Sequence, residues 1–286
     1  MLKNRLIASL LIKDGLIVQS FEFNKYLPIG KPRFSIEFVA KWDVDEIVLL
    51  DISASAKGKK INSKIIEKIS NYCYVPLTVG GGIKTVKDVQ ELIRAGADKI
   101  SINKSALERP LLISEISKTF GTQCVVVSID CKREPDGTYI VYKDSGRVST
   151  QKTASEWVQE FSLLGAGEIY LNSIDRDGCR NGYDLELINL ISQSVDIPVI
   201  ACGGVGKFDH FADGISKGKA SAVAASNIFH HVEHSTIIAK AYMKRSGINV
   251  RLDGLANYEN RKFDENGRLI MHSGEYLSEL DLVRRT

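Results

Sequence analysis

The chain repeats its own pattern at a long, fixed spacing. The glycine run Val79–Ile83 recurs 122 residues later as Ala201–Val205. The segment Lys99–Asn103 recurs as Ser221–Ala225 at the same offset. A period of this length marks a duplicated structural unit, and it constrains the fold before any single motif does. The repeat predicts two similar halves that build one structure.

The first segment of each half carries the most informative difference between them. Leu6–Lys13 matches Val125–Lys132 at an offset of 119 residues. In this alignment Leu11 stands where the second half has Asp130. Two equivalent positions therefore carry different chemistry, an aliphatic side chain in one half and a carboxyl group in the other.

Short apolar runs rich in Val and Ile alternate with helical patterns along the chain. Their hydrophobicity is continuous rather than alternating, which is typical of parallel strands buried on both faces. We therefore predict an α/β fold, a closed (β/α)8 TIM barrel made of two half-barrels, with a doubly wound open sheet as the alternative. The predicted strands are Leu6–Ile12, Glu46–Ile52, Val75–Val79, Lys99–Asn103, Cys124–Asp130, Glu168–Asn172, Pro198–Cys202 and Ala220–Ala225.

Local signals place helix starts, one hairpin and a domain boundary. Thr85 with Asp88 forms a capping-box pattern, and Asp184 is a candidate N-cap. The turn Glu134–Gly137 followed by Thr138–Tyr142 predicts a hairpin after the fifth strand. We predict one barrel domain over residues 1–253. Residues 254–286, where apolar periodicity weakens, form a short C-terminal extension of undefined role.

Composition excludes several classes of function. The formal net charge is only +3 and the charges are interspersed, so we expect no nucleic-acid partner. No segment reaches the roughly 20 apolar residues of a membrane helix, so we expect no membrane partner either. The five cysteines are dispersed without metal-ligand spacing. We expect a cytoplasmic protein without a metal or cofactor, and phosphorylated small molecules remain candidate ligands.

The duplicated glycine runs predict anion binding at two places. Glycines at strand ends let backbone N–H groups converge on a phosphate, and the next strand end in each half opens a helix. Barrel phosphate sites lie at this end of the strands. The alternative is a tight turn that requires glycine for steric reasons. The candidate residues are Gly82, Asn103 and Lys104 in the first half and Gly204, Ala225 and Ser226 in the second.

One carboxyl group is the main catalytic candidate. Asp130 ends a buried run and is expected to face the barrel mouth as a general acid or base. The alternative is an ion pair with Lys132 or Lys13. Asp51 and Asp177 also lie near strand ends, and we expect structural roles for both.

A second charged set lies at the opposite ends of the strands. Arg5, Glu46, Lys99 and Glu168 each precede or open a buried run. Two cations and two anions can neutralise one another as a ring, which desolvated charges require. The alternative is a device for stability, because the bottom of a barrel usually serves stability.

These motifs resemble one known family. Over nearly all of residues 1–253 the chain resembles the cyclase subunit of imidazole glycerol phosphate synthase, a (β/α)8 barrel with two phosphate sites at its top. In that family a glutaminase subunit docks on the bottom, and ammonia crosses the barrel interior. The matching stretches are Asp45–Ser55, Thr78–Ile83, Gly96–Asn103, Val125–Arg133, Gly165–Ile169, Ser173–Gly178, Gly203–Gly204 and Ala224–Ser226.

The resemblance implies roles for individual residues. Asp98 matches a contact with the glutaminase, and Lys104 replaces a small hydroxylated residue of the family. Thr78 and Ser101, with Val48 and Leu50, are the expected inward-facing residues of the ammonia passage. The implied phosphate-binding positions are Gly82, Asn103, Gly178, Gly204, Ala225 and Ser226. The implied gate to the passage consists of Arg5, Glu46, Lys99 and Glu168.

Three departures separate the chain from the family pattern. The family uses one aspartate from each half as an acid/base pair, and Leu11 replaces the first, while Asp130 matches the second. Gln19 replaces a lysine and Asn172 replaces a threonine. Losing one partner of proton transfer typically costs about 10²–10⁴-fold in rate, so we expect weak cyclase activity.

Sequences with this leucine resemble a paralogous branch found with bacterial surface-polysaccharide genes. In that branch the barrel and its glutaminase supply ammonia to an ATP-dependent sugar amidotransferase. We therefore predict an ammonia-channelling subunit that serves amidation of a surface sugar. The alternatives are an active cyclase in histidine biosynthesis and a phosphate-binding, non-catalytic regulator of a glutaminase.

Overall fold

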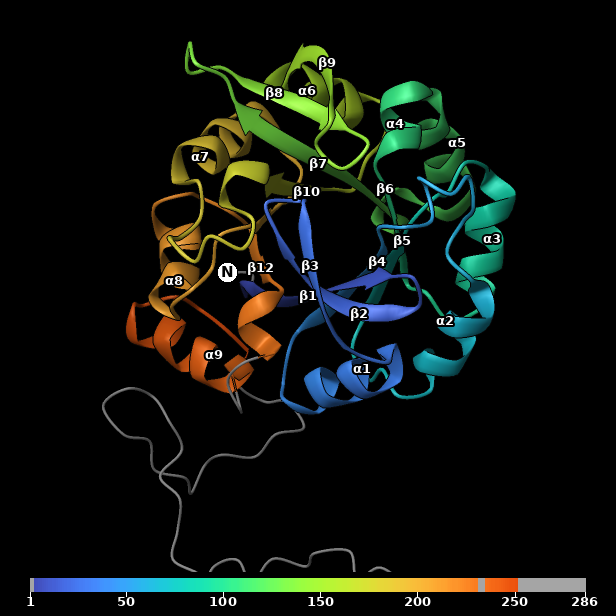
Figure 1. The fold of residues 1–286 in the computed structure, drawn as a ribbon. Coiled ribbons are helices and arrows are strands. Elements are labelled where there is room, and N and C mark those ends of the chain that lie inside the picture. The colour runs from blue at the N-terminus through green and yellow to red at the C-terminus, as the bar shows by residue number, and fades with distance from the viewer. Residues whose placement is uncertain (1–2, 231–234, 252–286) are drawn as a thin grey trace, which may run out of the picture.

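Parallel strands close into a barrel, as predicted. The computed structural model describes residues 3–230 and 235–251. Each strand of the barrel pairs in parallel with its neighbours, and β7 pairs with β10 to complete the circle (Figure 1). The barrel strands in spatial order are β1 (Arg5–Lys13), β4 (Glu46–Asp51), β5 (Leu77–Gly80), β6 (Lys99–Ile102), β7 (Val125–Arg133), β10 (Glu168–Ser173), β11 (Val199–Cys202) and β12 (Ala222–Ala225).

Helices surround the barrel and cover the outer face of its sheet (Figure 1). The predicted helix starts are confirmed: Thr85 and Asp88 form a capping box, and the Asp184 side chain accepts a hydrogen bond from the Leu187 N–H at 3.1 Å. The helices are α1 (Pro32–Lys41), α2 (Ser63–Ser70), α3 (Val86–Arg94), α4 (Lys104–Glu108), α5 (Leu111–Phe120), α6 (Ala154–Leu163), α7 (Leu185–Ser194), α8 (Asp209–Ser216) and α9 (Ser235–Arg245).

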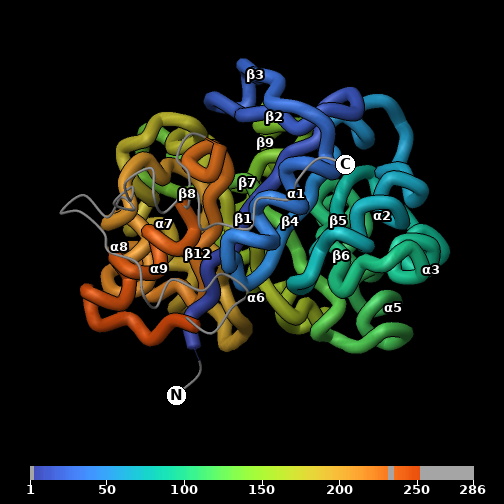
Figure 2. Tube along the Cα trace, turned by 90° about the horizontal axis from the view of Figure 1, so that it is seen from below, coloured from blue at the N-terminus to red at the C-terminus, as the bar shows by residue number. Residues whose placement is uncertain are grey.

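The duplication extends to two antiparallel hairpins at one end of the barrel. β8 (Tyr139–Lys143) pairs antiparallel with β7, which confirms the predicted hairpin, and the Gly137 N–H donates to the Glu134 carbonyl across the turn between them at 2.9 Å. β9 (Val148–Thr153) then pairs antiparallel with β8. β2 (Leu16–Phe21) and β3 (Lys25–Gly30) follow β1 in the same way. Figure 2 shows β2, β3 and β9 at the end of the molecule opposite the N-terminus.

Two separate apolar clusters hold the fold together. The larger cluster lies between the strands and the surrounding helices. The smaller one fills the barrel interior, and every member is 0–1% exposed: Ile7, Val48, Val126, Tyr170, Ile200, Ala222 and Ala224. The interior of the barrel is therefore packed rather than open along this stretch.

The predicted boundary between residues 253 and 254 and the extension after it lie outside the described residues. None of the described helices has the length and apolar character needed to cross a bilayer.

Candidate functional site

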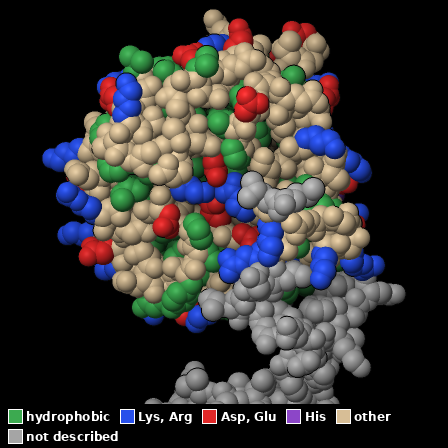
Figure 3. All heavy atoms as spheres, turned by 180° about the vertical axis from the view of Figure 1, so that it is seen from behind, with side chains coloured by type: hydrophobic (Ala, Val, Ile, Leu, Met, Phe, Trp, Pro, Cys, Tyr) green, Lys and Arg blue, Asp and Glu red, His purple; other side chains and the backbone are tan. Residues whose placement is uncertain are grey.

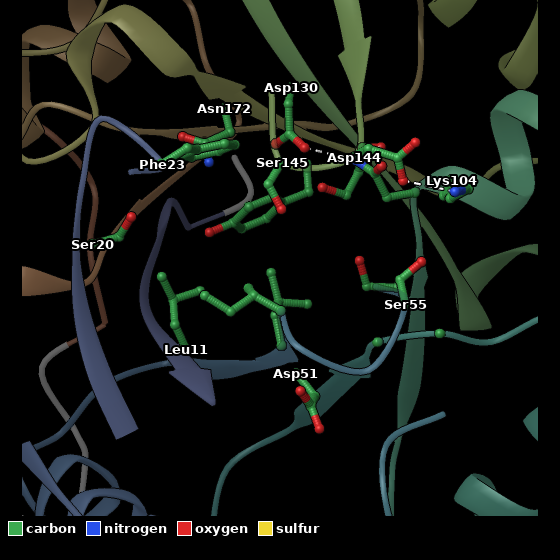
Figure 4. Close-up of a pocket in the computed structure, with 18 of the residues that line it drawn as sticks. Leu11, Ser20, Phe23, Asp51, Ser55, Lys104, Asp130, Asp144, Ser145 and Asn172 are labelled. Carbon is green, nitrogen blue, oxygen red and sulfur yellow. Dashed lines mark hydrogen bonds and ion pairs between the residues drawn. The ribbon is translucent and has the colours of Figure 1, made fainter. Parts of the chain in front are cut away.

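A chamber of about 170 Å³ opens at the carboxyl ends of the barrel strands. Leu11 and Asp130 lie on opposite sides of it, as the duplication predicts (Figure 4). The rest of the lining mixes apolar side chains with polar and charged ones, and it includes Ser9, Ser101, Ser128 and several residues of the two hairpins. In this chamber Asp130 therefore faces the aliphatic side chain of Leu11, which occupies the equivalent position in the first half.

Asp130 is held by amide groups and not by lysines. The Asn103 side-chain N–H donates to Asp130 Oδ2 at 3.0 Å, and to the Ser128 carbonyl at the same distance. Burial raises the pKa of Asp130 to about 7, against the lowering effect of hydrogen bonds from Asn103 and Asn172, while the nearby Asp177 raises it further. A carboxyl group with this pKa can both give and take a proton near neutrality.

The two weaker acid candidates are engaged by neighbouring backbone. Asp51 Oδ1 accepts hydrogen bonds from the Ser53 N–H at 2.9 Å and the Ala54 N–H at 3.0 Å. Asp177 Oδ2 accepts the Ser20 hydroxyl at 2.6 Å and the Phe23 N–H at 3.1 Å, which ties the β2–β3 hairpin over the chamber. These contacts agree with the structural roles expected for both residues.

The glycines at the strand ends are required sterically. Gly82 has a φ of +66°, and an added Cβ would lie 1.9 Å from the Lys59 carbonyl oxygen. Gly204 has a φ of +98°, and its Cβ would lie 2.2 Å from the Gly182 oxygen. Both positions satisfy the alternative of a tight turn that needs glycine, so their use in phosphate binding stays a prediction.

The two candidate anion sites differ in what surrounds them. In the first half Lys104 Nζ forms an ion pair with Asp144 Oδ1 at 2.7 Å, a residue of the β8–β9 loop (Figure 4). In the second half Gly178 packs on the Ser20 carbonyl, and Ser226 follows Ala225 at the end of β12. The Ser226 Oγ is buried without a hydrogen-bond partner among the described residues.

The four charged residues at the opposite end do form a ring. Arg5 contacts Glu46 at 2.7 Å and Glu168 at 3.0 Å, and Lys99 contacts the same carboxylates at 3.0 and 3.2 Å. Thr78 donates to the second oxygen of Glu46 at 2.7 Å. Figure 3 shows charged side chains of both signs at the centre of this face. The ring closes the bottom of the barrel.

A tyrosine that the sequence did not single out lies between ring and chamber. Tyr170 is 1% exposed, and its hydroxyl lies 2.8 Å from Ser9 Oγ and 3.0 Å from Cys202 Sγ. Since a tyrosine hydroxyl has one proton, it donates to one of these atoms and accepts from the other. The chamber reaches down to this level, where Ser101 also lines it. The predicted passage is thus shut in this state by Tyr170 above and the ring below.

The predicted partner contact lies on the same face as the ring. Asp98 is exposed and directly precedes β6. One of its carboxylate oxygens accepts the Leu77 N–H at 2.8 Å, which fixes the side chain. It is therefore placed where a docking protein could reach it.

Comparison with known proteins agrees with this fold. The model of the family described as "Histidine biosynthesis protein" matches residues 5–235, so the chain belongs to this family of barrel proteins. It is 46% identical, over 268 residues, to a Vibrio vulnificus protein provisionally assigned as imidazole glycerol phosphate synthase subunit hisF2. The match covers 94% of this chain and 98% of that protein. The chain is accordingly a HisF-like paralogue, which confirms the family resemblance.

Proposed function

We propose that the chain is the ammonia-channelling barrel subunit of a glutamine amidotransferase complex that amidates a surface sugar. The observation that carries the proposal is the unequal pair across the chamber, with Leu11 facing Asp130 (Figure 4). The charged ring of the ammonia gate is complete. The chain has therefore kept the parts that handle nitrogen and lost one of the two acids needed for cyclisation.

The partner is a HisH-like glutaminase that docks on the ring face. Asp98 is exposed there and directly precedes Lys99, a member of the ring. The acceptor of the nitrogen is then handled by a third protein, an ATP-dependent sugar amidotransferase. A phosphorylated small molecule at the strand ends fits the glycine geometry described above.

The packed interior sets a condition on this mechanism. Ammonia is neutral and crosses an apolar interior at far lower cost than ammonium does, because an uncompensated charge is expensive to desolvate. Arg5 and Lys99 must separate from their carboxylates, and Tyr170 must move, before nitrogen can pass. Transit is therefore coupled to side-chain motion.

The test uses the chain in complex with a HisH-like glutaminase from the same organism. With glutamine labelled with ¹⁵N in its amide, we expect label in the product of the sugar amidotransferase. We expect near-background turnover of the ribulosyl-formimino substrate of the histidine pathway. Robust cyclisation by the unaltered chain would instead establish the active cyclase. A complex that never transfers label to any product would favour the regulatory alternative.

A further inference from the structure

A second cavity lies above the chamber, between the two hairpins. Its volume is about 460 Å³, and it shares Phe23, Tyr26, Ser145 and Arg147 with the chamber below. The two spaces are therefore the outer and inner parts of one opening. We call the outer part the vestibule.

The duplication brings matching lysines to this vestibule. Lys13 ends the run that contains Leu11, and Lys132 is its equivalent after Asp130. Residues two apart on a strand point to the same side. Both lysines therefore project toward the barrel axis, one step above the Leu11 and Asp130 level. Arg147, from the loop between β8 and β9, completes what we call the cationic collar.

None of the three collar cations forms an ion pair with a carboxylate of the described residues. Lys13 Nζ lies 4.9 Å from the centroid of the Tyr26 ring, and Lys132 Nζ lies 5.9 Å from that of Tyr142. Arg147 Nε donates to the Asp144 carbonyl at 2.8 Å, which leaves its charge uncompensated.

Most other charged side chains at the mouth form ion pairs, so the collar dominates the net charge of the vestibule. Lys57, which also lines the vestibule, is paired with Asp14. In the chamber Lys104 is paired with Asp144. Glu22 is the remaining acid of the vestibule lining. The vestibule therefore presents net positive charge above a chamber whose lining carries more carboxyl groups than cations.

We propose that the cationic collar binds the diphosphate of a ligand whose uncharged end enters the chamber. Three cations from two facing strands and one loop suit a group with several negative oxygens, and the guanidinium of Arg147 can bind phosphate in a forked geometry. The Phe23 and Tyr26 rings offer apolar faces beside the phosphates.

This inference goes beyond the proposed function, because the third protein handles the nitrogen acceptor, whereas the collar ligand is bound by the barrel itself. The collar is distinct from the glycine-based phosphate positions, because it lies beyond the strand ends and uses side chains. Its ligand carries a diphosphate, and a nucleoside diphosphate and free pyrophosphate are the two sources of this chemistry.

The experiment is calorimetric titration of the full-length chain with pyrophosphate, uridine diphosphate and uridine. We expect saturable binding of at least one diphosphate and none of uridine. The double variant Lys13→Gln/Lys132→Gln should bind that diphosphate about tenfold more weakly, since two charge-assisted contacts are lost. Tighter binding of uridine diphosphate than of pyrophosphate identifies a nucleoside-linked ligand, and equal binding identifies the diphosphate alone.

Matched variants separate the collar from other sites. Lys57→Gln changes a lysine in the same cavity whose charge is already paired, so it should leave affinity within about twofold. Two results would overturn the proposal: no saturable diphosphate binding, or a loss caused by Lys104→Gln but not by the collar variant. Thermal unfolding of each variant verifies that it is folded. Label transfer from glutamine can succeed when binding fails, so the two proposals fail separately.

Discussion

Replacing Glu46 by glutamine tests the charged ring most directly. Glu46 is 1% exposed, and it contacts Arg5 at 2.7 Å and Lys99 at 3.0 Å. At an effective dielectric constant of about 20, these contacts correspond to gross attractions of about 6 and about 5.5 kcal/mol. Desolvation offsets much of that sum, and deleting one member of a buried ion pair typically costs about 3–5 kcal/mol net. Glu168 alone would then have to compensate both cations.

The expected result is a large fall in stability with the fold retained. For a domain of this size about 1 kcal/mol shifts the midpoint by roughly 2–4 °C, so Glu46→Gln should melt on the order of 10 °C lower. Differential scanning calorimetry measures this, with Glu37→Gln, at an exposed pair with Lys41, as a control that should not move. Adding Lys99→Met to Glu46→Gln should recover part of the loss. If Glu46→Gln melts at the same temperature as the control, Glu46 does not balance the charges of Arg5 and Lys99.

Two further outcomes are expected at the chamber. Leu11→Asp should raise the rate of cyclisation of the ribulosyl-formimino substrate with ammonium at least about tenfold above that of the parent chain. Adding Asp130→Asn to this variant should abolish the gain. An unchanged rate for Leu11→Asp alone contradicts the role assigned to Leu11. The raised pKa of Asp130, about 7, means that the folded chain keeps a proton between about pH 4 and pH 7 that the unfolded chain has released. The contribution of Asp130 to the free energy of unfolding therefore falls as pH rises through that window and is constant above it. Relative to Asp130→Asn, urea unfolding should therefore show a free energy of unfolding about 2–3 kcal/mol lower at pH 8 than at pH 5. Parallel pH profiles for the two proteins would mean that Asp130 has the pKa of an ordinary carboxyl group. The groups that face Asp130 or interact with its charge are Asn103, Asn172, Asp177, Cys202 and Tyr26.

The barrel could be predicted because its signals are periodic or duplicated. Each predicted strand corresponds to an observed barrel strand, and the ring followed from charges at the starts of buried runs. The first hairpin was missed although its signal was present. Asp14-Gly15 between apolar runs is a strong hairpin signal, and both residues have positive φ, 53° and 83°.

The missing parts of the site depend on contacts between distant residues. A strand buried on both faces gives no alternation, so sequence cannot tell which side of β10 carries Tyr170 into the interior. The pairing of Lys104 with Asp144 spans 40 residues and depends on the shape of a loop. Asn103 was expected to serve an anion, and its amide also binds Asp130, a role visible only once both strand ends are placed together.

The tyrosine between ring and chamber has a consequence for timing. If the barrel conducts ammonia as proposed, the closure at the base and the one above the apolar stretch can open alternately, so that the interior is never open at both ends. Nitrogen would then travel in single portions, each released by a protein movement on the microsecond-to-millisecond scale of such gating. Bulk water and protons would be excluded at every moment, so the interval between portions, rather than diffusion, would set the pace of the complex.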